Sequence, residues 1–156
     1  MPPRSEGKVP HLDLTQRPPR SFHVRLGGYV GLPRMLDKGR ATLAKKNGEY
    51  NYNSYTDQHL VRFLGFDPKA LLRELAKGKG DGEILAWVLA HAKTPRAPWE
   101  VKAWAAYVEN LGPDGSTEDL TGFANYVGQH SKTREDVITW FDALDLDDYV
   151  SFGGKP

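Results

Sequence analysis

The sequence predicts an all-α fold: a single compact bundle of about six to seven helices behind an extended, proline-rich N-terminal arm. Apolar residues recur at helical spacing from about residue 32 onward. These stretches begin at proline or capping residues, and short glycine-containing loops separate them. We therefore expect an arm over residues 1–22 and one helical domain over residues 23–156.

The bulk composition is that of a soluble globular domain. The chain has 156 residues, of which 39% are hydrophobic and 26% charged. No apolar run approaches the roughly 20 residues of a membrane span. The polar, proline-broken N-terminus does not resemble a signal peptide, so a cytoplasmic location is expected by default. Because cysteine is absent, disulfides and thiolate metal sites are excluded.

The N-terminal arm owes its predicted shape to proline. Five prolines lie within residues 1–22, a composition that favours extended backbone over a helix, and we expect the first ten residues to be mobile. Phe22, Val24 and Leu26 then alternate with period two, as in a strand. Since no other segment offers a convincing partner strand, we interpret this stretch as an extended lead-in.

The first helix is predicted from about Leu32 to Lys46. Pro33 suits its first turn, and Gly48 lies where a C-cap is expected. Gly39, in the middle, costs about 1 kcal/mol relative to alanine, which predicts close packing of another element there.

Further helix starts are indicated by capping residues and prolines. We expect these helices to begin after Thr56, after Asp67 at Pro68, after Asp81, at Pro98, after Ser116 and after Thr133.

Charge is distributed unevenly along the chain. Residues 1–80 hold 15 Lys and Arg against 7 Asp and Glu, a net charge of +8, whereas residues 81–156 hold 6 against 13, a net charge of −7. Three interpretations stay open: the two halves neutralise each other, the basic half faces an anionic ligand, or copies associate head to tail.

Five segments resemble the bacterial DUF5069 family, and together they extend over about residues 12–154. They are LDLTQRPPRS (12–21), VRLGGYVGLPRMLDKGRATLA (24–44), NGEYNYN (47–53), GKGDGEIL (78–85) and DDYVSFGG (147–154). The resemblance implies a single bacterial domain with the stretch 25–55 in its signature. It implies no activity, cofactor or catalytic residue, because the family is one of unknown function.

The predicted first helix carries the main candidate site. Arg34, Asp37, Lys38 and Arg40 are three or four residues apart in pairs, so they lie on neighbouring helix faces. One interpretation is a solvated, salt-bridged surface. The other is an anion-binding or acid–base cluster, in which three cations against one carboxylate leave room for an external carboxylate or phosphate.

A tyrosine-rich loop follows that helix. Tyr50, Tyr52 and Tyr55 either pack by their rings with hydroxyls at the surface, or form a platform for a ligand or a base.

Other motifs are weaker. The KGKGDG segment at 77–82 lacks phosphate-loop spacing, and we interpret Asp142, Asp145, Asp147 and Asp148 as a solvated acidic turn. The five histidines show no metal-ligand spacing, so we predict neither a metal site nor a cofactor.

Three functions follow. The favoured one is binding of a small anionic ligand or partner through Arg34, Lys38, Arg40, Tyr50 and Tyr52, without a catalytic motif. The second is a metal-independent enzyme on a small anionic metabolite, with Asp37 as the candidate catalytic residue. The third, binding of RNA or single-stranded nucleic acid, is possible but not favoured. The sequence indicates no membrane partner and leaves the oligomeric state open.

Overall fold

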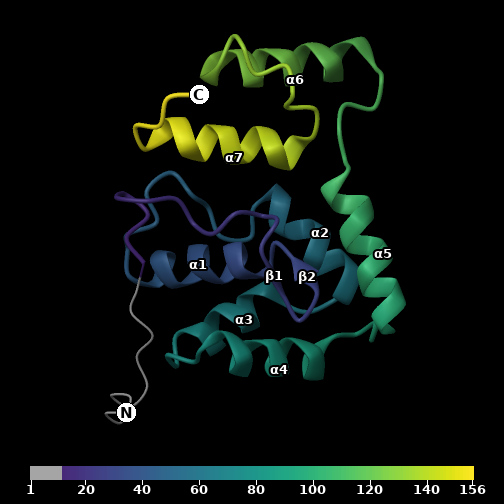
Figure 1. The fold of residues 1–156 in the computed structure, drawn as a ribbon. Coiled ribbons are helices and arrows are strands. Elements are labelled where there is room, and N and C mark those ends of the chain that lie inside the picture. The colour runs from purple at the N-terminus through teal and green to yellow at the C-terminus, as the bar shows by residue number, and fades with distance from the viewer. Residues whose placement is uncertain (1–11) are drawn as a thin grey trace, which may run out of the picture. The chain divides into compact units, whose positions relative to one another are not determined.

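The chain is predominantly helical, which confirms the predicted fold class. The computed structural model describes residues 12–156, and these contain seven helices and one two-stranded sheet (Figure 1). The first ten residues of the predicted arm lie outside the described residues. By internal contacts the chain divides into two units, residues 1–102 and 103–156. The predicted boundary between an arm and one domain stays a prediction.

Most elements belong to the first unit, and α5 crosses into the second. In chain order, the elements of both units are β1 (Arg25–Leu26), β2 (Tyr29–Val30), α1 (Leu32–Leu43), α2 (Tyr55–Leu64), α3 (Pro68–Leu75), α4 (Asp81–His91), α5 (Pro98–Glu109), α6 (Thr117–His130) and α7 (Trp140–Ser151). Among the described residues, no helix is both long enough and apolar enough to cross a membrane.

Helix α1 is the centre of the first unit. It contacts α2, α3 and β1, and α3 in turn contacts α4 (Figure 1). Every residue from Leu32 to Ala41 is buried. Close packing at Gly39 is confirmed, because a Cβ there would lie 2.5 Å from Cδ1 of Leu75 and 3.2 Å from the Tyr52 ring. Burial on all sides encloses the charged residues of α1 together with its apolar ones.

The lead-in to α1 is a small hairpin, which corrects the expectation of an unpartnered segment. Arg25 pairs with Val30 and Leu26 with Tyr29 in antiparallel register. Gly27 and Gly28 make the turn with φ of 61° and 86°, a backbone region that glycine enters at little cost. The partner strand has two residues, too few for alternation to be visible in the sequence.

Two predicted helix ends were wrong. Helix α1 ends at Leu43 with Ala44 as its C-cap, so Gly48 is not the cap. Helix α2 begins at Tyr55, two residues before the start predicted after Thr56. Its N-cap is Ser54, because Ser54 and Asp57 form a reciprocal capping box.

The predicted starts of α3, α5 and α6 are confirmed, whereas that of α4 needs a correction. The Asp67 side chain accepts a hydrogen bond from Lys69 N at the start of α3, and Ser116 accepts one from Asp119 N at α6. Asp81, however, is the first residue of α4, and Gly80 is its N-cap. The Asp81 carboxylate is therefore available for contacts outside its own helix.

In the second unit, α6 and α7 lie side by side and run in the same direction (Figure 1). Phe123, Val137, Ala143 and Leu146 form the core between them. The helix predicted after Thr133 begins only at Trp140, where the Thr139 side chain accepts a hydrogen bond from Asp142 N. It then continues through the acidic segment that we interpreted as a turn.

Candidate functional site

The four charged residues of α1 are buried. Arg34, Asp37, Lys38 and Arg40 are 2%, 2%, 3% and 5% exposed, which rules out the solvated, salt-bridged surface. A buried charge is costly unless it is paired and hydrogen-bonded. Within the described residues, no buried side-chain nitrogen or oxygen lacks a hydrogen-bond partner. The partners come largely from other segments of the first unit.

Asp37 is held by Arg20 from the segment before β1. Arg20 donates to Asp37 Oδ2 from its backbone N at 2.9 Å and from Nε at 3.0 Å. Its Nη2 donates to Oδ1, also at 3.0 Å. Both carboxylate oxygens of Asp37 are therefore occupied by one arginine, in the two-pronged geometry that guanidinium favours.

Arg20 also connects α1 to the start of α4 through Asp81. Its Nη1 donates to Asp81 Oδ2 at 2.8 Å, and Arg40 Nη1 donates to Asp81 Oδ1 at 2.7 Å. Arg40 further donates from Nη2 to the Lys79 carbonyl at 3.1 Å. The result is a continuous chain of charges, Asp37–Arg20–Asp81–Arg40, built from three separate segments.

The pKa values reflect this pairing. Burial alone would raise the pKa of Asp81, but hydrogen bonds from Arg20 and Arg40 outweigh it and hold the pKa below its usual value. Burial would lower the pKa of Arg20, and hydrogen bonds to Asp37 and Asp81 raise it instead. Both pKa shifts stabilise the charged forms of Arg20 and Asp81.

A cavity of about 590 Å³ opens beside this chain, and we call it the arginine cavity. Its lining residues are Leu12, Arg17, Pro18, Arg20, Asp37, Arg40 and Asp81. Three guanidinium groups face two carboxylates, which leaves a net charge of +1. Arg17 is exposed, and it has no ion pair or hydrogen bond to any residue from 12 to 156 in the structure.

Lys38 is committed to a different contact. Its Nζ lies 2.8 Å from Asp57 Oδ2 and donates to Ser54 Oγ at 2.8 Å. Both side chains are nearly inaccessible, at 3% and 1% exposed. Burial raises the pKa of Asp57, although Lys38 and the Ser54 backbone act in the opposite direction. This ion pair joins α1 to the N-terminus of α2.

The tyrosines of the following loop do not line the arginine cavity. Arg34 Cζ lies 5.5 Å from the centre of the Tyr50 ring, and Arg34 Nη1 donates to the Arg20 carbonyl at 3.3 Å. Tyr52 donates its hydroxyl to the Pro68 carbonyl at 2.5 Å, and burial raises its pKa. Tyr55, by contrast, is 78% exposed.

The predicted site residues therefore fall into four places. Arg40 and the candidate Asp37 line the arginine cavity, and Lys38 pairs with Asp57. Arg34 packs on Tyr50, and Tyr52 donates to the Pro68 carbonyl at the start of α3. Sequence reasoning missed Arg17, Arg20 and Asp81. The first two flank the prolines of the RPPR motif. Charged residues on both sides of a segment whose backbone is fixed by proline could have indicated a site there. Asp81 was not predicted as a site residue because it was interpreted as a helix cap.

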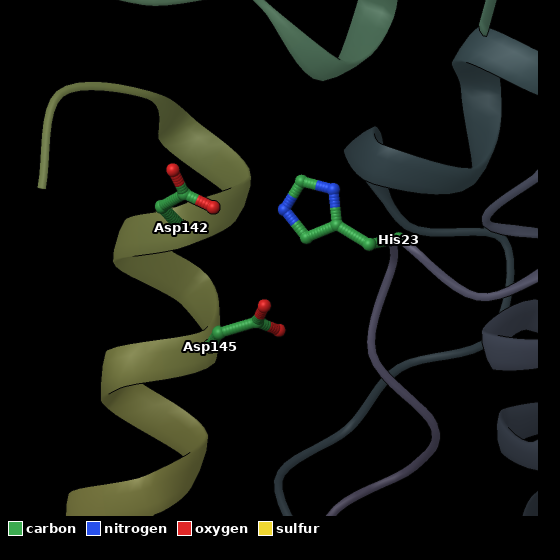
Figure 2. A group of neighbouring side chains, drawn as sticks. All are labelled: His23, Asp142 and Asp145. Atoms are coloured by element: carbon green, nitrogen blue, oxygen red, sulfur yellow. The ribbon is translucent and has the colours of Figure 1, made fainter.

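Four acidic residues of the second unit, Asp142, Asp145, Asp147 and Asp148, lie along α7. Asp142 and Asp145 project from the same side of this helix, as Figure 2 shows. His23, which Figure 2 also labels, belongs to the first unit. Asp147 accepts hydrogen bonds from Tyr126 Oη at 2.7 Å and from Ser151 Oγ at 2.9 Å. The helix replaces the predicted acidic turn because Thr139 caps it and its apolar residues pack on α6.

A comparison with models of protein families gives a match. The family model for a domain of unknown function, DUF5069, matches residues 16–150. No curated protein matches the chain. The matched range includes all lining residues of the arginine cavity except Leu12.

Proposed function

Because the chain belongs to the DUF5069 family, whose function is unknown, we propose a function from its own geometry: the first unit binds a small anionic ligand in the arginine cavity. One observation carries this proposal. Three arginines and two aspartates surround a cavity of about 590 Å³, a size within the range of small-molecule sites. The resulting net charge of +1 favours an anion.

The arrangement of the arginines supports binding by a pre-formed site. Asp37 and Asp81 fix Arg20 and Arg40 before any ligand arrives, so little side-chain entropy remains to be lost on binding. Arg17 supplies a guanidinium at the exposed side of the cavity, where it can hold a carboxylate or a phosphate oxygen pair.

The contacts favour binding over catalysis. A general base must be able to take a proton, yet both oxygens of Asp37 accept hydrogen bonds from Arg20. The Tyr52 hydroxyl is engaged as well, because it donates to the Pro68 carbonyl, and its pKa is raised. The alternative of a metal-independent enzyme therefore has no supporting contact among these residues.

The nucleic-acid alternative also lacks support from the tyrosines. Tyr50 has the Arg34 guanidinium on its ring, and Tyr52 packs against Gly39 of α1. A base-stacking platform needs open ring faces on successive aromatic residues.

The proposal is tested by calorimetric titration of the full chain with methanesulfonate at low ionic strength. Replacing Arg17 with alanine is expected to weaken binding at least tenfold, because a hydrogen bond to a charged group contributes roughly 1.5–3 kcal/mol and about 1.4 kcal/mol corresponds to a factor of ten. Arg62→Ala is the matched control, since Arg62 is an exposed arginine of α2 that does not line the cavity. Equal affinities for wild type and Arg17→Ala would contradict the proposal.

A further inference from the structure

The charge balance of the arginine cavity indicates which anions it selects. We propose that Asp81 is a specificity-determining residue that tunes the cavity to small organic anions carrying a single negative charge. This inference rests on the proposed function and adds to it the charge class of the ligand.

Asp81 occupies the position between two cations that a second ligand charge would need. Its Oδ2 accepts from Arg20 at 2.8 Å and its Oδ1 from Arg40 at 2.7 Å. The Arg40 side chain is only 6% exposed, and Asp81 itself is 31% exposed. The carboxylate therefore already acts as a resident anion for the guanidinium groups of Arg20 and Arg40, whereas Arg17 lines the cavity as an exposed residue.

Charge scaling explains why this arrangement favours monoanions. Attraction between a ligand and the site grows in proportion to the ligand charge, because the site presents a fixed potential. The cost of removing the ligand from water grows with the square of its charge, as in Born solvation. With Arg17, Arg20 and Arg40 opposed by Asp37 and Asp81, the site has a net charge of only +1. The attraction of such a site offsets the cost of removing a monoanion from water, but not the larger cost of removing a dianion.

The cavity wall also suits an organic group. Leu12 and Pro18 line the cavity beside the arginines. A ligand with an apolar body can place that body on these side chains and its charged head near Arg17. Burying apolar ligand surface against these side chains adds a hydrophobic contribution to binding. An inorganic dianion has no apolar part with which to gain this contact.

Methanesulfonate and sulfate are suitable probes, because both have tetrahedral sulfur-centred heads and they carry one and two charges. Wild-type protein is expected to bind methanesulfonate at least tenfold more tightly than sulfate in calorimetric titrations at constant ionic strength. Asp81→Asn raises the site charge to +2 while its amide oxygen can still accept a hydrogen bond. Both anions should then bind more tightly, and the gain for sulfate should be about the square of the gain for methanesulfonate.

Glu49→Gln is the matched control, because it removes one negative charge from an exposed position of the same unit outside the cavity. Its ratio of affinities for the two anions should equal that of wild type. If Asp81→Asn leaves the ratio of affinities for the two anions unchanged while methanesulfonate binding still depends on Arg17, the proposed role of Asp81 is wrong. The proposed function then stands. If Asp81→Asn does not fold, the wild-type ratio decides, and equal affinities overturn the inference. Absence of binding by either anion overturns the proposed function as well.

Discussion

At the residue scale, the main finding is that the charges of α1 find their partners far away in the sequence. Asp37 pairs with Arg20, 17 residues earlier, and Arg40 with Asp81, 41 residues later. Spacing along one helix identifies which residues share a face, but it carries no information on such partners. The sequence therefore indicated that charged residues cluster on this helix. Their ion-pair partners and their burial could be identified only from the structure.

Lys38 and Asp57 form a buried pair whose strength can be measured with a double-mutant cycle. Lys38→Met should lower the free energy of unfolding by about 3–5 kcal/mol, because it leaves the Asp57 carboxylate buried without its cation. Combined with Asp57→Asn, the loss should be clearly smaller than the sum of the single losses. Denaturant unfolding of the four proteins gives the coupling.

An ion pair with an exposed lysine provides the control for that cycle. Lys77 Nζ lies 2.7 Å from Glu74 Oε1, and the side chains of Lys77 and Glu74 are 60% and 12% exposed. Glu74 keeps its ion pair with Lys79 when Lys77 is replaced. Lys77→Met should therefore change the free energy of unfolding by less than about 1 kcal/mol. A buried pair that proved no more strongly coupled than this one would contradict our description of the α1–α2 contact.

Asp81 should make the free energy of unfolding depend on pH in the acidic range. Its pKa in the folded chain is lowered from 3.8, so the folded state favours the ionised form. The resulting stabilisation is fully present above pH 3.8 and is lost as the pH falls through the lower, folded-state pKa. The difference in unfolding free energy between wild type and Asp81→Asn should thus shrink below pH 3.8. A difference independent of pH between 7 and 3 would show that the ionised Asp81 contributes nothing.

At the element scale, the sequence predicted which helices exist better than where they end. Proline and capping residues marked the starts of α3, α5 and α6, because these signals act within one turn of the helix. The β1–β2 hairpin and the late start of α7 depend on packing or on two-residue pairing, which leave no periodic pattern.

Gly31 makes the entry into α1 possible, and its replacement should be destabilising. It has φ of 79°, and a Cβ at this position would collide with the buried ring of Phe22. Gly31→Ala should lower the free energy of unfolding by about 2–4 kcal/mol, through left-handed strain and overpacking.

Gly82→Ala offers a comparison in the same unit. Gly82 lies in the first turn of α4, and a Cβ there would meet no atom within 4 Å. This change should be neutral or stabilising by up to about 1 kcal/mol, because alanine is the better helix former. Thermal unfolding of both variants distinguishes a specific need for glycine at Gly31 from a general sensitivity of the chain.

At the scale of the whole molecule, charge follows the division into units. Residues 1–102 hold 18 Lys and Arg against 10 Asp and Glu, and residues 103–156 hold 3 against 10. The arginine cavity lies entirely in the basic unit. The charge distribution in the sequence thus indicated the unit in which we place the candidate site. Which cations of that unit line the cavity, namely Arg17, Arg20 and Arg40, depends on the fold.

The most direct test of the anion-binding account is an NMR titration of the arginine side chains of the full chain with methanesulfonate. We predict that the Nε–H resonances of Arg17, Arg20 and Arg40 shift together and saturate with one dissociation constant, while Arg62 in α2 does not move. Small, unsaturable shifts of equal size at all four arginines would contradict it, because they would indicate general screening of positive charge and no site.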